Sequence, residues 1–111
     1  MSYDIWLEVD LGGEEPARID DLDWNYTSNC APMWRKAMPD TDGLAGMHGM
    51  PAGQAAEHLR NGIAAMEADP AAFRVLNPEN KWGDFDGQLE QLKELLAACA
   101  RNPKAVLAVW R

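Results

Sequence analysis

Side chains suited to binding a ligand are concentrated in residues 24–36 of the sequence. This stretch combines indoles, a phenol, carboxamides, a hydroxyl and a guanidinium, contributed by Trp24, Asn25, Tyr26, Thr27, Asn29, Trp34 and Arg35. Carboxamides can bond to the polar edge of a ligand, indoles can stack on a flat ring, and a guanidinium can bind phosphate or carboxylate. Together these groups would suit a nucleotide-like ligand.

The same segment also has a structural interpretation. Asn25 and Asn29 would then satisfy backbone groups at a turn and at the start of a helix, while Trp24 and Trp34 would fill the core. Pro32 supports a helix start, because proline suits the first turn of a helix. The sequence leaves both interpretations open.

Two loop residues extend the candidate ligand-binding set. His48 lies between Gly46 and Gly49, and Trp82 precedes Gly83. A loop histidine can act as a general base, so a small hydrolase such as a phosphodiesterase ranks third among the hypotheses. No nucleophile-elbow, phosphate-loop, dinucleotide-binding or metalloprotease motif accompanies the histidine. We therefore predict a protein that is not an enzyme, with no catalytic residue and no cofactor.

The acidic run Asp20–Asp21–Leu22–Asp23 could suggest a calcium site. It lacks the glycine and the distal bidentate glutamate that shape a calcium loop, so we predict no bound metal. A simpler role for these carboxylates is to keep an edge strand from pairing with other chains.

Negative charge is concentrated in the N-terminal part of the chain. The net charge of the whole chain is -8. Residues 1–42 hold ten acidic and three basic side chains, so almost all of this charge lies there. Nonspecific nucleic-acid binding is therefore not expected, because it depends on Lys and Arg neutralising phosphates. A partner protein with a basic surface fits this charge better.

The start of the sequence has neither a basic stretch nor a long apolar run. We therefore expect no secretory signal, no membrane association and a cytoplasmic location. Cys30 and Cys99 are too few for a disulfide framework, so both are predicted to be free thiols.

The elements that must position these side chains begin with a β-hairpin. Residues 3–11 alternate apolar and mostly acidic side chains, which is the two-residue period of a half-buried strand. Glycines and a proline at 12–16 predict a turn, and a second strand is expected at about residues 18–26. The β-branched residues near the C-terminus predict a third strand within residues 104–110 that joins the hairpin.

Helical periodicity marks the middle of the chain. We predict a short helix at 32–37, a long helix from 52 to 66, one or two turns at 70–76 and the longest helix from about 85 to 99. Residues 38–51 and 77–83, rich in Gly, Pro and Asn, are expected to be loops. The predicted fold is a single α+β domain, residues 1–111, with a hairpin (1–27), a helical segment (32–101) and a strand (104–110). Its small antiparallel sheet, of about three strands, packs on two main helices and short helical turns.

Trp6 lies on the otherwise charged face of the first predicted strand, where Trp110 could pair with it across the sheet. Exposed tryptophans are enriched at interfaces, so the two could form a partner surface or the contact of a homodimer or higher homo-oligomer. Packing at the edge of the core would explain them equally well.

Several segments resemble a family of small uncharacterised proteins from bacteriophages and bacterial genomes. The resemblance rests on the opening 1–5, on Asn25-x-Thr27-x-Asn29-x-Ala31-Pro32, and on a Gly-containing and a Trp-containing loop, each followed by a helix. It covers about residues 1–100. The chain differs in carrying Trp34 and Arg35 after the motif and in ending with a strand-like segment.

This resemblance implies a binding role rather than a known activity. A phage protein of this size would act inside the host bacterium, and the leading hypothesis is a counter-defence sponge that sequesters a host nucleotide-derived immune signal. Such a site would need a closed pocket, completed by loop 38–51 or by a second subunit. The alternative is an acidic inhibitor that binds a host protein.

Overall fold

A computed structural model describes residues 2–10 and 12–110, and for residues 20–23 it describes the backbone alone. Its strands are β1 (Ser2–Val9), β2 (Ala17–Thr27), β3 (Met50–Pro51) and β4 (Val106–Trp110). Its α-helices are α1 (Ala31–Ala37), α2 (Ala52–Ala68), α3 (Pro70–Arg74) and α4 (Phe85–Arg101). The predicted α+β class with an antiparallel sheet is confirmed.

The sheet has the strand order β2-β1-β4-β3, and all neighbouring strands are antiparallel. The predicted hairpin forms with Ser2 opposite Thr27, and the C-terminal strand joins it with Ile5 opposite Val109. β1 therefore lies between β2 and β4, so residues from both ends of the chain share one sheet.

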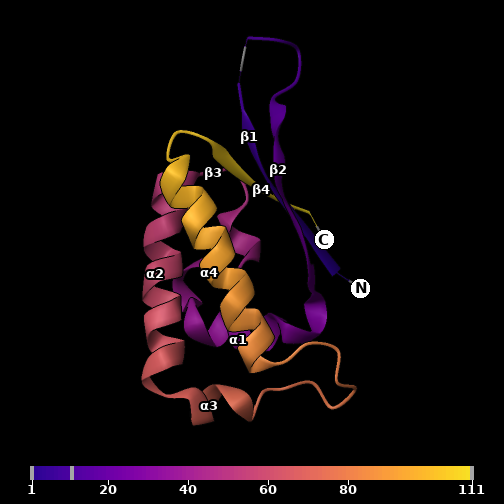
Figure 1. Cartoon of the computed structure of the whole chain (residues 1–111), viewed down its shortest axis with the longest axis vertical. Coiled ribbons are helices and arrows are strands. Elements are labelled where there is room, and N and C mark those ends of the chain that lie inside the picture. Colours follow the sequence, from indigo (N-terminus) through magenta and orange to yellow (C-terminus); the bar gives the residue numbers. More distant parts are fainter. Residues whose placement is uncertain (1, 11, 111) are drawn as a thin grey trace.

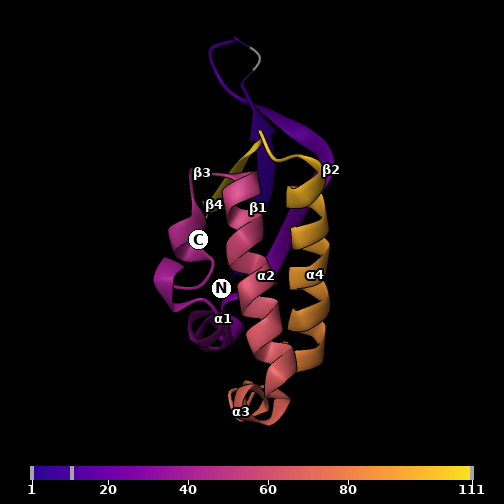
Figure 2. The same ribbon diagram turned by 90° about the vertical axis from the view of Figure 1, so that its left-hand side faces the viewer.

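The helices cover one face of this sheet, and the opposite face is left without a helix in the part of the chain that the structure describes (Figure 1 and Figure 2). The alternation predicted for β1 explains the two faces. Ile5 and Leu7 are fully buried on the helix side, whereas Asp4, which points to the other side, is exposed. Burial of the apolar side chains on one face is the main stabilising contribution to such a layered fold.

The two long helices present apolar stripes to the sheet. α2 buries Leu59 and Met66, and α4 buries Phe85, Leu92 and Leu95, so the helical periodicity read from the sequence is confirmed. α4 starts at a side-chain cap, because the Asp84 carboxylate accepts a hydrogen bond from the backbone N–H of Gly87.

Residues 38–51, predicted to be a loop, contain more structure than expected. Two short 3-10 helices (Pro39–Thr41 and Ala45–Met47) precede β3, which adds a fourth strand to the sheet. Backbone bonds hold the segment on β4, since the N–H of Gly49 donates to the carbonyl of Leu107 (2.8 Å). A strand of two residues has no measurable side-chain period, which is why the sequence pattern did not indicate it.

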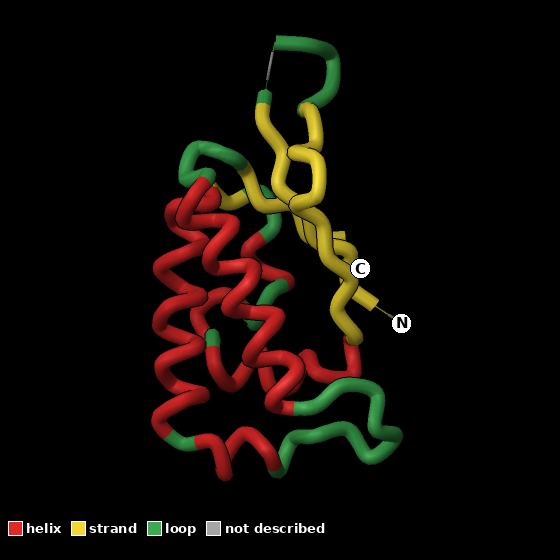
Figure 3. Tube along the Cα trace, viewed as in Figure 1, coloured by secondary structure: helices red, strands yellow, loops and turns green. Residues whose placement is uncertain are grey.

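The hairpin of β1 and β2 extends beyond the helical layer (Figure 1 and Figure 3). β1 begins and β4 ends at the opposite end of the sheet, where Asp4 is opposite Trp110 (Figure 1). Among the described residues, no helix has the length and apolar character needed to cross a bilayer.

Candidate functional site

Two of the sequence-predicted ligand residues belong to the core. Tyr26 and Trp34 are fully buried, with ring centroids 6.0 Å apart. The Tyr26 hydroxyl donates to the carbonyl of Gln91 (2.7 Å), and the Trp34 indole N–H donates to Oε1 of Gln88 (2.8 Å). Burial raises the pKa of the Tyr26 phenol well above its usual range, and the nearby Glu94 adds to the effect. The expectation that these two rings contact a ligand is corrected, because a ligand cannot reach them.

Thr27 takes the capping role that the structural interpretation of the sequence gave to Asn25 and Asn29. The Thr27 hydroxyl oxygen accepts hydrogen bonds from the backbone N–H (3.4 Å) and the side-chain amide (2.9 Å) of Asn29. Asn29 in turn accepts a bond from the Asn80 amide (3.4 Å), which ties the end of β2 to the loop before α4. Thr27 therefore caps the 3-10 turn Ser28–Cys30, whereas the side chain of Asn29 bonds to other side chains.

Arg35 and His48 are not brought to the junction of β2 and α1. Arg35 is exposed on α1 and borders neither of the two hollows described below. His48 is tied to β4, where its Nδ1 accepts a hydrogen bond from the backbone N–H of Val109 (3.0 Å). The predicted grouping of Arg35 and His48 with the Asn and Thr side chains is therefore not observed.

One hollow, here called the junction hollow, lies where β2 ends and α4 begins. It has a volume of about 500 Å³. Its lining is mostly polar and consists of Asn25, Thr27, Lys81, Gly83, Asp84, Gly87, Gln88 and Gln91. Trp82, which adjoins this lining in the chain, is 68% exposed. This hollow is the nearest equivalent of the polar ligand site predicted from the sequence.

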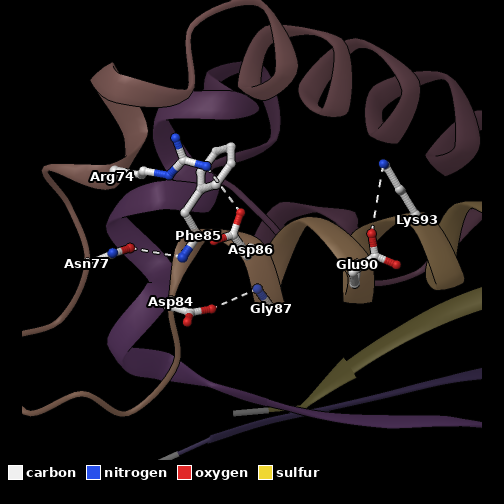
Figure 4. Close-up of polar contacts among 8 residues, drawn as sticks. All are labelled: Arg74, Asn77, Asp84, Phe85, Asp86, Gly87, Glu90 and Lys93. Carbon is white, nitrogen blue, oxygen red and sulfur yellow. Dashed lines mark hydrogen bonds and ion pairs between the residues drawn. The ribbon is translucent and has the colours of Figure 1, made fainter.

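The start of α4 beside the junction hollow is already capped by side chains of this protein (Figure 4). Asp84 accepts a bond from the N–H of Gly87 (2.7 Å), and Asn77 accepts one from the N–H of Phe85 (2.9 Å). Asp86, in the first turn, pairs with Arg74 at 3.2 Å. Asp84 and Asn77 satisfy two of the amides that an anion would otherwise bind, and Asp84 and Asp86 place carboxylates in the first turn, so the helix start disfavours a phosphate.

A second hollow, here called the sheet hollow, lies on the sheet and has a volume of about 520 Å³. Its lining consists of Asp4, Ile5, Trp6, Arg18, Trp24, Asn25 and Trp110. We call its helix-free surroundings, made by Asp4, Trp6, Glu8, Arg18, Asn25 and Trp110, the open face. Trp24 lies opposite the buried Ile5, so its ring belongs to the helix side, where it packs against the core.

The strand register explains how the open face is assembled. Asp4 on β1 lies between Asn25 on β2 and Trp110 on β4, because it is opposite both residues. Opposite residues in antiparallel strands share a face. The Asn25 amide donates to Asp4 Oδ1 (2.7 Å) and to the Ser2 hydroxyl (3.0 Å), so the carboxylate has a fixed position beside Trp110.

Trp6 is held on the open face by two polar contacts. Its indole N–H donates to Glu8 Oε2 (2.9 Å), and the guanidinium carbon of Arg18 lies 3.9 Å from the centre of its ring. This distance is well within the range of a cation–π interaction. Trp110, two residues along β4 from the position opposite Trp6, remains 67% exposed.

Metal-ligand groupings and comparisons with known proteins add no further assignment. Within residues 2–10 and 12–110, no three His, Cys, Asp or Glu side chains whose positions are described come together as a metal site. The acids at positions 20, 21 and 23 lie outside the described side chains. Comparisons with protein-family models, with curated proteins and with solved structures find no match. The resemblance noted from the sequence stays a prediction.

Sequence reasoning identified part of the open face and missed the rest. It placed Trp6 and Trp110 on one face, but the predicted pairing of the two is wrong, because Trp6 is opposite Ala108 and Trp110 is opposite Asp4. It also did not include Asp4 or Arg18 among the candidate ligand residues. Arg18 had one available signal, since it is the only basic residue among residues 1–27. Lys81 and Gln91 of the junction hollow carried no comparable signal.

Proposed function

We propose that this protein is a non-enzymatic binding protein that docks a basic surface of a partner protein on its open face. The observation that carries this proposal is the pair of indoles, Trp6 and Trp110, on the helix-free side of a strongly acidic hairpin sheet. Residues 1–27 contain eight acidic side chains and one basic one. Aromatic anchors surrounded by charge are typical of protein interfaces.

The two kinds of residue would contribute differently to docking. Acidic side chains on the projecting hairpin would attract a basic partner and raise the association rate, an effect that salt weakens. Burial of an exposed tryptophan would supply much of the affinity, because such anchors commonly contribute about 2 kcal/mol or more, roughly thirtyfold in binding. Trp110 is the natural anchor, since two thirds of its surface is free.

The test compares two tryptophans of equal exposure. The intact chain and its Trp110→Ala and Trp82→Ala variants are immobilised and exposed to a bacterial lysate at low and high salt, and bound proteins are identified by mass spectrometry. We expect a basic protein that is lost with Trp110→Ala and at high salt, but is retained by Trp82→Ala, because Trp82 is 68% exposed away from the open face. Capture that depends on neither Trp110 nor the salt concentration would overturn the proposal.

The volume and polar lining of the junction hollow favour a second candidate function, the capture of a small nucleotide-like ligand whose phosphate would pair with Lys81 and not with the start of α4. Its volume lies in the range of small-molecule pockets, and Asn25, Thr27 and Gln91 offer groups that can bond to a base or a sugar. Lys81 is the one basic residue among the described residues that line it. Native mass spectrometry with a nucleotide mixture tests this candidate. A nucleotide adduct that Lys81→Ala removes would support it, and an unliganded spectrum at millimolar nucleotide would exclude it.

A further inference from the structure

We propose that the sheet hollow receives an arginine side chain of the partner, with the guanidinium against Trp110 and paired with Asp4. This inference rests on the proposed function and deepens it, because it names the group that the open face recognises. The hollow combines an exposed indole, a fixed carboxylate and an amide within one row of the sheet, formed by Asn25, Asp4 and Trp110.

The chain itself shows that the aromatic surface accepts a guanidinium. Arg18 places its guanidinium carbon 3.9 Å from the centre of the Trp6 ring, on the same face of the sheet. A planar, weakly hydrated guanidinium stacks on an indole more favourably than a hydrated ammonium does. Trp110 offers a second indole in the same hollow, and its surface is still exposed.

The polar groups of the hollow are acceptors suited to such a cation. Asp4 uses Oδ1 to accept from the Asn25 amide, and no hydrogen bond within the described part of the chain engages its Oδ2. The Asn25 nitrogen donates to both Ser2 and Asp4, so its carbonyl oxygen can still accept a bond. A guanidinium has five N–H donors in one plane and can bond to both acceptors while it stacks.

The charges around the hollow favour a cation over an anion. Asp4 lines the hollow, and Glu8 holds the Trp6 indole beside it. Among the described residues that line the hollow, Arg18 alone is positively charged, and its guanidinium already lies on Trp6. Because Arg18 would repel an incoming arginine and attract an incoming phosphate, its removal should favour the first ligand and disfavour the second.

The Arg18→Ala variant therefore distinguishes the two ligands by the direction in which the affinity changes. Arg18→Ala exposes the second indole and removes the competing cation, so it should strengthen arginine binding about two- to fivefold. Asp4→Asn removes the paired charge with little change in shape and should weaken binding by a similar factor. Trp110→Ala should abolish measurable binding, while Trp82→Ala should leave it unchanged.

The probe is a short blocked peptide with two arginines spaced by glycine and serine, added at millimolar concentration to the intact chain. The readout is the nuclear magnetic resonance shift of each indole N–H, assigned through single Trp→Phe variants. Matched peptides carry lysine or the neutral arginine isostere citrulline. We expect the arginine peptide to shift the Trp6 and Trp110 signals more than the lysine peptide does, with no effect of citrulline and none on Trp82.

Failure of this inference and failure of the proposed function give different results. If arginine and lysine peptides shift the two indoles equally, the open face binds basic chains without recognising arginine, and only the arginine pocket is overturned. If neither peptide shifts these indoles, both the pocket and the docking proposal are overturned. A loss of binding in Arg18→Ala would also overturn the pocket, because the site would then depend on a cation of its own.

Discussion

Replacement of Gly83 with alanine should destabilise the fold where the loop before α4 meets the start of α1. Gly83 has φ +88°, a region that side chains with a Cβ rarely adopt. A Cβ at this position would lie 2.7 Å from Cys30 Sγ and 2.8 Å from Thr27 Cγ2. Both atoms belong to buried or half-buried side chains, so neither can move away freely.

The expected loss of unfolding free energy in Gly83→Ala has two parts. The left-handed backbone costs an alanine about 1–2 kcal/mol, and overpacking against a filled core adds about 1–3 kcal/mol. Gly49 is the control that separates the backbone cost from the packing cost. It has φ +81°, and no neighbouring atom would lie within 4 Å of a Cβ there. Gly49→Ala should therefore cost only the backbone part, and Gly83→Ala should cost clearly more.

Urea unfolding followed by circular dichroism measures both changes in unfolding free energy. A double variant, Gly83→Ala with Cys30→Ala, should recover part of the loss, because it removes the sulfur that the new methyl group meets. Equal destabilisation by Gly83→Ala and Gly49→Ala would refute the reasoning, since it would mean that the loop does not pack on Cys30 as described.

Two further predictions concern the buried polar groups. Gln88→Leu should destabilise the chain by about 1–3 kcal/mol, because it leaves the Trp34 indole N–H buried without its acceptor; thermal unfolding measures the loss, and no loss would indicate another acceptor. Burial raises the pKa of the Cys30 and Cys99 thiols to about 11 from 9.0, with the charge of Asp84 adding to the effect at Cys30. Since the folded chain disfavours the thiolate, this stabilisation is complete below pH 9 and is lost as the pH rises through 11, by about 1–3 kcal/mol per thiol. Urea unfolding across this pH range should show a larger loss in the intact chain than in a Cys→Ala double variant, which keeps the contribution of the buried Tyr26 phenol above pH 10. An equal pH dependence of the two would contradict the assignment.

The fold could be predicted from the sequence wherever a single period persisted over several residues. The alternation around Ile5 and Leu7 placed β1 correctly, and the apolar spacing of α4 placed its buried side. β3 was missed because its pairing depends on backbone bonds such as Gly49 to Leu107, which leave no side-chain pattern. Local periodicity does not report contacts made by so short a strand.

The candidate site was less predictable, because it depends on residues that are distant in the sequence. No local pattern around Trp34 indicates that its N–H will bond to Gln88, 54 positions away. Residues close in sequence were also separated, since Arg35 and Asn25 belong to different surfaces. The open face was partly predicted because one strand period places Trp6 among charged residues, while Asp4 and Trp110 meet only through the register of β1 and β4.

The hydrogen bond between His48 and Val109 has a consequence for how the sheet ends. β3 pairs with β4 only at Val106 and Leu107, so the amide of Val109 lies past the last paired residue. An imidazole nitrogen accepts a bond only when it carries no proton, so the ring bonds to this amide through an unprotonated Nδ1. The ring thereby occupies an amide on which another chain could start to extend the sheet. A single side chain thus occupies the backbone donor at which pairing along this margin of the sheet could continue.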